Sequence, residues 1–156
     1  MIDLSLEECK YCKVATLCGK DNDGYPECRA CRVCNFFELV LYRPIGFKLL
    51  GWQRRVLRDL YGTLDPDSGL RQYRRAYISV AKKNGKSFLV AGLPIYHMLI
   101  ESELNPQAYG AAAAKDQATI VFNAAARLVK ANPLLGAQLR VLPSTKRIVR
   151  RDLGAG

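Results

Sequence analysis

The sequence predicts an α/β fold in which helices cover a parallel sheet. Short β-prone runs alternate with longer runs whose apolar residues recur every three or four positions. A small, basic turn joins one of these short runs to the helix pattern that follows it. Of the 156 residues, 49% are hydrophobic and 24% are charged, which is typical of a folded domain.

The first half of the chain predicts two helices, a loop and a strand. Residues 36–43 (FFELVLYR) and 52–62 (WQRRVLRDLYG) have apolar side chains at helical spacing. Residues 63–72 (TLDPDSGLRQ) hold the proline, glycine and aspartate residues of a turn-rich loop. Residues 76–80 (AYISV) then form a short β-prone run, which we expect to be a strand.

The second half repeats this alternation. We expect a helix from Ser87 to about Glu101 and a strand of small residues at 107–114 (QAYGAAAA). The clearest helix pattern covers residues 115–131, and residues 146–150 (KRIVR) are expected to form a last strand. The order strand, helix, strand, helix is that of a parallel α/β layer.

Charge and cysteine content divide the chain near residue 35. Residues 1–35 carry five basic and six acidic side chains, whereas residues 36–156 carry 19 basic and eight acidic ones. All six cysteines lie in the first segment. We therefore expect a cysteine-rich segment at 1–35 and a basic domain at 36–156. A basic domain favours a polyanionic partner, a nucleotide or a nucleic acid, although a solvated basic surface gives the same totals.

The cysteine spacing predicts a structural zinc ion (Zn²⁺). Two C-x2-C pairs are separated by fifteen residues, and their members are Cys9, Cys12, Cys28 and Cys31. Four thiolates complete a tetrahedron and leave no open position for catalysis. Cys18 and Cys34 leave the ligand set open, because Cys34 can replace Cys28 or all six cysteines can share two zinc ions. Disulfides and an iron–sulfur cluster remain the alternatives.

The turn at residues 79–87 (SVAKKNGKS) ends like a phosphate-binding loop. Such a loop needs small residues whose amides face phosphate, a lysine for the terminal phosphates, and a hydroxyl for Mg²⁺ at a helix start. The matching residues here are Asn84, Gly85, Lys86 and Ser87. Val80 stands where the usual pattern has its first glycine, so a basic turn without a ligand remains the alternative.

Three stretches resemble the large terminase subunit of tailed bacteriophages. They are GFKLLGWQRRVLRDLYG (46–62), YRRAYISVAKKNGKSFLVAGLPIY (73–96) and YGAAAAKDQATIVFNAAARLV (109–129). The resemblance extends over roughly residues 36–151. Phosphate loops of that family often lack the first glycine and carry basic residues before Gly-Lys, so Val80 fits the family pattern.

The resemblance implies a P-loop ATPase that uses ATP and Mg²⁺ to package double-stranded viral DNA. By this likeness Lys86 contacts the β and γ phosphates and Ser87 holds Mg²⁺. Lys83 belongs to the basic part of the loop, and Lys82 stabilises transition-state charge in cis, as an arginine finger does.

Two glutamines also match family positions. Gln53, next to Trp52, corresponds to a glutamine that reads the adenine edge; the alternative is a core tryptophan beside an exposed amide. Gln117 matches as well, although a solvent-facing helical glutamine is an equal alternative.

The implied partners are viral DNA, a small terminase subunit and the capsid portal, in a homo-oligomeric motor in the host cytoplasm. Two features agree with a location away from membranes. The N-terminus lacks the basic start and apolar core of a signal peptide, and the longest apolar run, residues 88–100, is too short to span a bilayer.

The sequence departs from the family in one respect. A terminase motor needs a strand that ends in two acidic residues, and residues 88–156 contain no adjacent acidic pair. The nuclease domain of the family is not recognisable either. We therefore expect the N-terminal part of a P-loop ATPase domain, with an incomplete parallel sheet, which hydrolyses ATP poorly or not at all on its own.

Two other functions remain open at this point. One is a non-enzymatic, zinc-containing module that binds nucleic acid, and the other is part of a different P-loop DNA translocase or helicase. Nucleotide titration separates the first from an ATPase, because only an ATPase requires the lysine of the loop to bind nucleotide.

Overall fold

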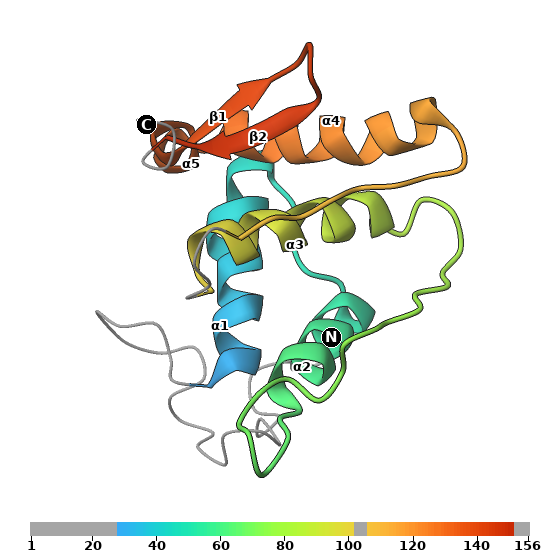
Figure 1. The fold of residues 1–156 in the computed structure, drawn as a ribbon, viewed down its shortest axis with the longest axis vertical. Helices are drawn as coiled ribbons and strands as arrows, with labels where there is room; N and C mark the ends of the chain where they lie inside the picture. Colours follow the sequence, from blue (N-terminus) through green and yellow to red (C-terminus); the bar gives the residue numbers. More distant parts are fainter. Residues whose placement is uncertain (1–27, 102–105, 152–156) are drawn as a thin grey trace. The chain divides into compact units, whose positions relative to one another are not determined.

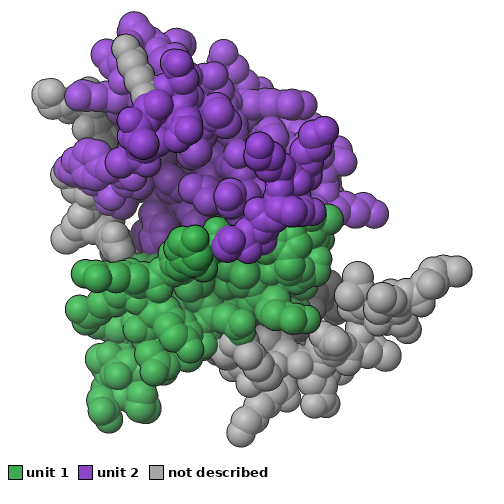
Figure 2. Space-filling model, turned by 90° about the vertical axis from the view of Figure 1, so that its right-hand side faces the viewer, with its two compact units in different colours: residues 1–38, 49–78 green, residues 39–48, 79–156 purple. Residues whose placement is uncertain are grey.

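The computed structural model describes residues 28–101 and 106–151 (Figure 1). These residues fall into two compact units. Figure 2 colours the units separately. The described part of unit 1 comprises residues 28–38 and 49–78, and that of unit 2 comprises residues 39–48, 79–101 and 106–151.

Unit 1 is built on two helices that pack against each other, α1 (Arg29–Asn35) and α2 (Gly51–Gly62). Their buried apolar side chains include Ala30, Val33, Leu57 and Tyr61. Arg54 of α2 forms an ion pair with Glu38 at 2.5 Å. Both side chains are partly exposed, so we expect this pair to contribute at most about 1 kcal/mol.

The expected helix at 36–43 is present, but its form differs from a regular α-helix. After α1, the chain continues as a π-helix, η1 (Phe36–Tyr42), and then as a 3₁₀ turn, η2 (Arg43–Ile45). The helical turns therefore run without a break across residue 35. Pro44 lies in η2 and Gly46 follows it with φ 71°, so the helix stops where proline and glycine favour its end.

The loop after α2 has the turn chemistry that its sequence predicts. Leu64 and Arg71 form an isolated antiparallel bridge, and Gly69 between them has φ +64°. The Asp65 carboxylate accepts hydrogen bonds from the Ser68 amide and hydroxyl, each at 2.8 Å. These bonds favour the ionised form and lower the pKa of Asp65.

Unit 2 contains the helices α3 (Lys86–Leu99) and α4 (Lys115–Ala131), which pack against each other. Both agree with the helices predicted from apolar periodicity. Leu89, Ile95 and Tyr96 of α3 are buried, as are Leu128 and Val129 of α4. This apolar face holds in place the start of α3, and with it the loop at residues 81–85.

A short helix and a hairpin follow α4. Helix α5 (Pro133–Gln138) leads into β1 (Leu139–Leu142), which pairs antiparallel with β2 (Arg147–Arg150). In Figure 1 the hairpin lies along α4, which contacts β1. Arg150 Nη1 donates to the Met98 carbonyl at 3.1 Å and links β2 to the last turn of α3.

Asn132 joins α5 to the start of unit 2. Its Oδ1 accepts from the Leu134 amide at 3.0 Å, which caps α5, and its Nδ2 donates to the Val40 carbonyl at 2.9 Å. The residue is buried, so these bonds satisfy polar atoms that would otherwise be costly to bury.

The expected strand at 146–150 is confirmed as β2, whereas the expectations for 76–80 and 107–114 were wrong. Those two runs lie outside any β-ladder, and the described residues contain a single sheet, the two-stranded antiparallel β1–β2 pair. A strand exists only through hydrogen bonds to a neighbouring strand, and the described residues offer these runs none. The parallel sheet is therefore not seen in the described part of the chain.

Candidate nucleotide-binding site

The loop before α3 turns sharply, and its sequence explains the turn. Lys83 has φ 67° and Gly85, the N-cap of α3, has φ 73°, so two of three successive residues adopt the left-handed conformation. Glycine adopts it without steric cost, which suits position 85. The Asn84 side chain donates to the Ala81 carbonyl at 3.3 Å and braces the turn.

The helix that follows begins without a side-chain cap. Lys86 and Ser87 are its first two residues, and no side chain accepts a hydrogen bond from its first turn. The first amides of a helix have no partner within the helix and carry its partial positive charge. An uncapped start next to a lysine and a serine therefore attracts an anion.

A pocket of about 710 Å³ is lined by this loop and by α4. Its volume is in the range of small-molecule sites. The loop contributes residues 80–88, and the remaining lining residues are Phe47, Ile120, Asn123, Ala124 and Arg127. Four lining side chains, Lys82, Lys83, Lys86 and Arg127, are cationic and none is acidic. The pocket is therefore suited to a polyanion with an apolar portion.

Sequence reasoning missed the pocket-lining residues that lie far from the loop in the sequence, among them Phe47 and Arg127. The Phe47 and Phe88 rings pack edge to face with centroids 5.1 Å apart. The Arg127 guanidinium lies 5.7 Å from the centroid of Phe88. An exposed arginine within an amphipathic helix was a detectable signal, but most such arginines are solvated.

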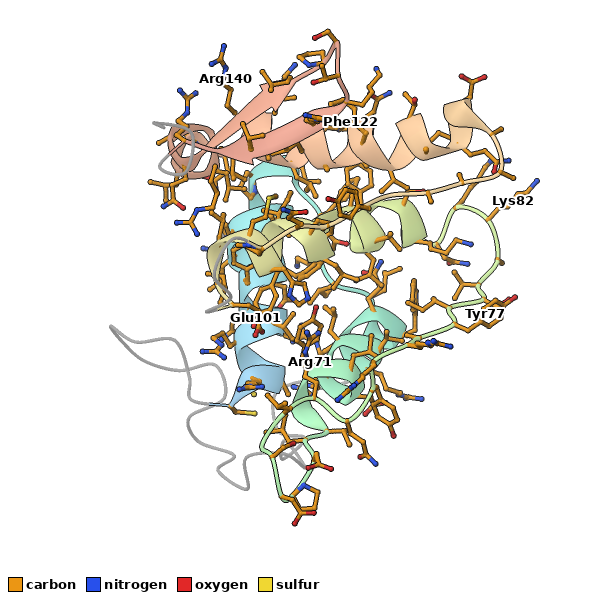
Figure 3. The ribbon with its side chains drawn as sticks, viewed as in Figure 1. Arg71, Tyr77, Lys82, Glu101, Phe122 and Arg140 are labelled. Carbon is orange, nitrogen blue, oxygen red and sulfur yellow. The ribbon has the colours of Figure 1, made fainter. Side chains whose placement is uncertain are left out.

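The structure brings together the loop residues that the motif predicted. Asn84, Gly85, Lys86 and Ser87 all line the one pocket, as do Lys82 and Lys83. Figure 3 shows the Lys82 side chain extending outward from the loop. A role for Lys82 in hydrolysis stays a prediction.

Gln53 lies in unit 1, where it is 2% exposed. Its Oε1 accepts from the Leu50 amide at 3.1 Å, so this side chain closes the first turn of α2. The exposed amide of the alternative interpretation is not observed, and contact with adenine stays a prediction. Gln117 is exposed in the first turn of α4 and is absent from the described pocket lining.

The described cysteines lie at the start and on the buried face of α1. Cys28 is its N-cap, and Cys31 and Cys34 are buried in unit 1. Cys28 and Cys34 form no disulfide, whereas Cys31 is disulfide-bonded. The remaining members of the predicted zinc set, Cys9 and Cys12, and the additional Cys18 lie outside the described residues.

No metal-binding group is found where the structure can be searched. Within residues 28–101 and 106–151 there is no cluster of three or more histidine, cysteine, aspartate or glutamate side chains suited to a metal ion. Zinc therefore stays a prediction from the cysteine spacing.

Comparison with known proteins identifies the relatives of this chain. The family described as "Terminase large subunit, ATPase domain" matches residues 51–151. This chain belongs to the terminase large-subunit family. It is 39% identical over 123 residues to the large terminase subunit of Enterobacteria phage HK97, a match that covers 76% of this chain and 24% of that protein.

The crystal structure of the HK97 bacteriophage large terminase has a similar fold. The TM-score is 0.67 at 33% sequence identity, and the match covers 78% of this chain and 25% of the HK97 chain. The resemblance drawn from the motifs is thus confirmed. The chain has a mixed helix and strand fold similar to a terminase ATPase domain, and it spans about a quarter of the length of these relatives.

Among the described helices of this terminase chain, none combines the length and apolar character needed to cross a bilayer.

Proposed function

We propose that this chain carries the ATP- and magnesium-binding loop of a phage terminase motor. The observation that supports this most directly is the pocket at the uncapped start of α3. Its lining includes residues 80–87 of the predicted phosphate loop, four cations and no acidic side chain. Membership of the terminase ATPase-domain family supports the same function.

Each loop residue has a role that its position supports. The amides at residues 84–87 donate to phosphate oxygens, and the Lys86 ammonium binds the β and γ phosphates as a point charge. The Ser87 hydroxyl, at the second position of α3, supplies an oxygen ligand to Mg²⁺. ATP, when bound, supplies the phosphoryl group whose hydrolysis drives a motor of this kind.

The remaining proposals concern the whole motor. Its substrate is double-stranded viral DNA, and its partners are a small terminase subunit, the capsid portal and further copies of the large subunit, in the host cytoplasm. The 19 basic and eight acidic side chains of residues 36–156 favour contact with DNA phosphates. Gln53 as an adenine contact and Lys82 as a cis-acting cation belong to this proposal.

Titration of the full chain with ATP tests the nucleotide site. We expect saturable binding of Mg²⁺-ATP that weakens when EDTA removes Mg²⁺, because the Ser87 hydroxyl would help to hold the metal, and the metal would offset the negative charge of the phosphates. The Ser87→Ala variant should bind ATP with a smaller dependence on Mg²⁺, since it lacks the hydroxyl ligand. Isothermal titration calorimetry measures both. Absence of saturable binding, with DNA binding retained, would favour the non-enzymatic nucleic-acid module.

Metal analysis of the purified chain tests the zinc prediction. Under reducing conditions we expect about one zinc ion per chain, held by the four thiolates of the two C-x2-C pairs. Cys28→Ser should remove the metal, whereas Cys34→Ser should retain it if Cys34 lies outside the set. A metal content near zero in the unaltered chain would instead support disulfide pairing, which the disulfide-bonded Cys31 favours.

A further inference from the structure

Arg127 is a cation of the pocket that the phosphate-loop motif does not include. It lies on α4, 41 residues after Lys86 in the chain, yet it lines the same pocket as the loop. Within the described residues its side chain interacts with the Phe88 ring and makes no hydrogen bond or ion pair. Its five N–H donors therefore remain available for a ligand.

One aromatic ring contacts the Arg127 guanidinium, and a second ring packs against the first. Phe88 lies under its guanidinium at 5.7 Å, and Phe47 packs edge to face on Phe88 at 5.1 Å. Phe88 is the third residue of α3, so the ring that positions Arg127 belongs to the same helical turn as Lys86 and Ser87. Cation–π contact fixes a guanidinium plane without using its donors.

The chemistry of this wall selects an oxyanion. Arginine presents a planar fork of donors that matches two oxygens of one phosphate, and none of the residues lining the pocket is acidic. We propose that Arg127 binds the polyphosphate tail of the nucleotide from α4, on the wall that faces the phosphate loop across the pocket. This proposal rests on the nucleotide-binding function proposed above and adds a second element to that site.

A comparison of ATP with inorganic tripolyphosphate tests the assignment. Arg127→Gln in the full chain should weaken the binding of both ligands by about 10-fold, because a charge-assisted phosphate contact is lost in each. Arg127→Lys should recover part of this loss, since it restores the charge without the fork. Competition with a fluorescent ATP analogue measures both ligands in one assay.

The matched control is Lys130→Gln, which removes a charge from the same exposed side of α4 but does not touch this pocket. It should leave both affinities unchanged, and circular dichroism verifies that each variant is folded. A loss of affinity for ATP alone would place Arg127 at the adenine base and overturn the phosphate assignment. Unchanged affinity for both ATP and tripolyphosphate would also overturn it. If the unaltered chain binds neither ligand, the proposed function itself fails and this inference fails with it.

Discussion

Lys86→Ala is expected to lower the affinity for Mg²⁺-ATP by about 100-fold, since it removes the cation that we propose contacts two phosphates. Lys86 is the first residue of α3, it is exposed, and it makes no hydrogen bond or ion pair within the described residues. Its removal therefore costs no packing, and alanine is a good helix former. Isothermal titration calorimetry gives the affinity, and thermal unfolding should show an unchanged midpoint.

Lys130→Ala provides the control for this experiment. It makes the same chemical change on an exposed lysine of α4 that is not among the residues lining the pocket. The two variants have the same net charge, so a general electrostatic effect would weaken ATP binding equally in both. Equal affinities in the two variants would show that Lys86 is not a specific phosphate ligand.

The loop side of the candidate site could be predicted from sequence because its residues are consecutive. Asn84 to Ser87 form one turn and one helix start, so local chemistry alone brings their amides and side chains together. Arg127 reaches the same pocket because unit 2 packs α4 against α3, and Phe47 reaches it from the segment after η2, which also contacts α4. No local sequence pattern predicts such packing, and the contributions of Arg127 and Phe47 to the pocket were therefore missed.

The same distinction holds for the fold. The helices α2, α3 and α4 carry their own periodicity and hydrogen bonds, and they were predicted close to their observed bounds. Residues 76–80 and 107–114 have strand-like composition, but a strand depends on a partner that the segment does not contain. The strand β1 was missed for the converse reason, because its four residues gain their structure from pairing with β2.

Helix α1 shows how a strong motif can hide a weaker pattern. Cys28, Cys31 and Cys34 suggested metal ligands, and their segment was not expected to be helical. Cysteine is also a small apolar residue, and in α1 Cys31 and Cys34 are buried alongside Ala30 and Val33. The spacing 30, 31, 33, 34 is that of one helix face, so both patterns were present in the same residues.

Leu128→Ala is expected to have the largest effect on stability, lowering the free energy of unfolding of unit 2 by about 3 kcal/mol. Leu128 is fully buried, at 0% exposure, on the face by which α4 packs within unit 2. Its truncation loses apolar transfer energy and leaves a cavity between helices that the backbone cannot easily close.

Leu134→Ala makes the identical change at a position that is 74% exposed, in α5 two residues after the buried Asn132 cap. It removes little buried surface and leaves the Leu134 amide free to donate to Asn132, so a loss within about 0.5 kcal/mol is expected. Hydrogen exchange of the α3 and α4 amides measures unit 2 separately from unit 1. Equal losses in the two variants would mean that α4 does not pack as described. Because the phosphate loop and Arg127 sit on these two helices, the Leu128 variant should also bind Mg²⁺-ATP more weakly at temperatures where unit 2 begins to open.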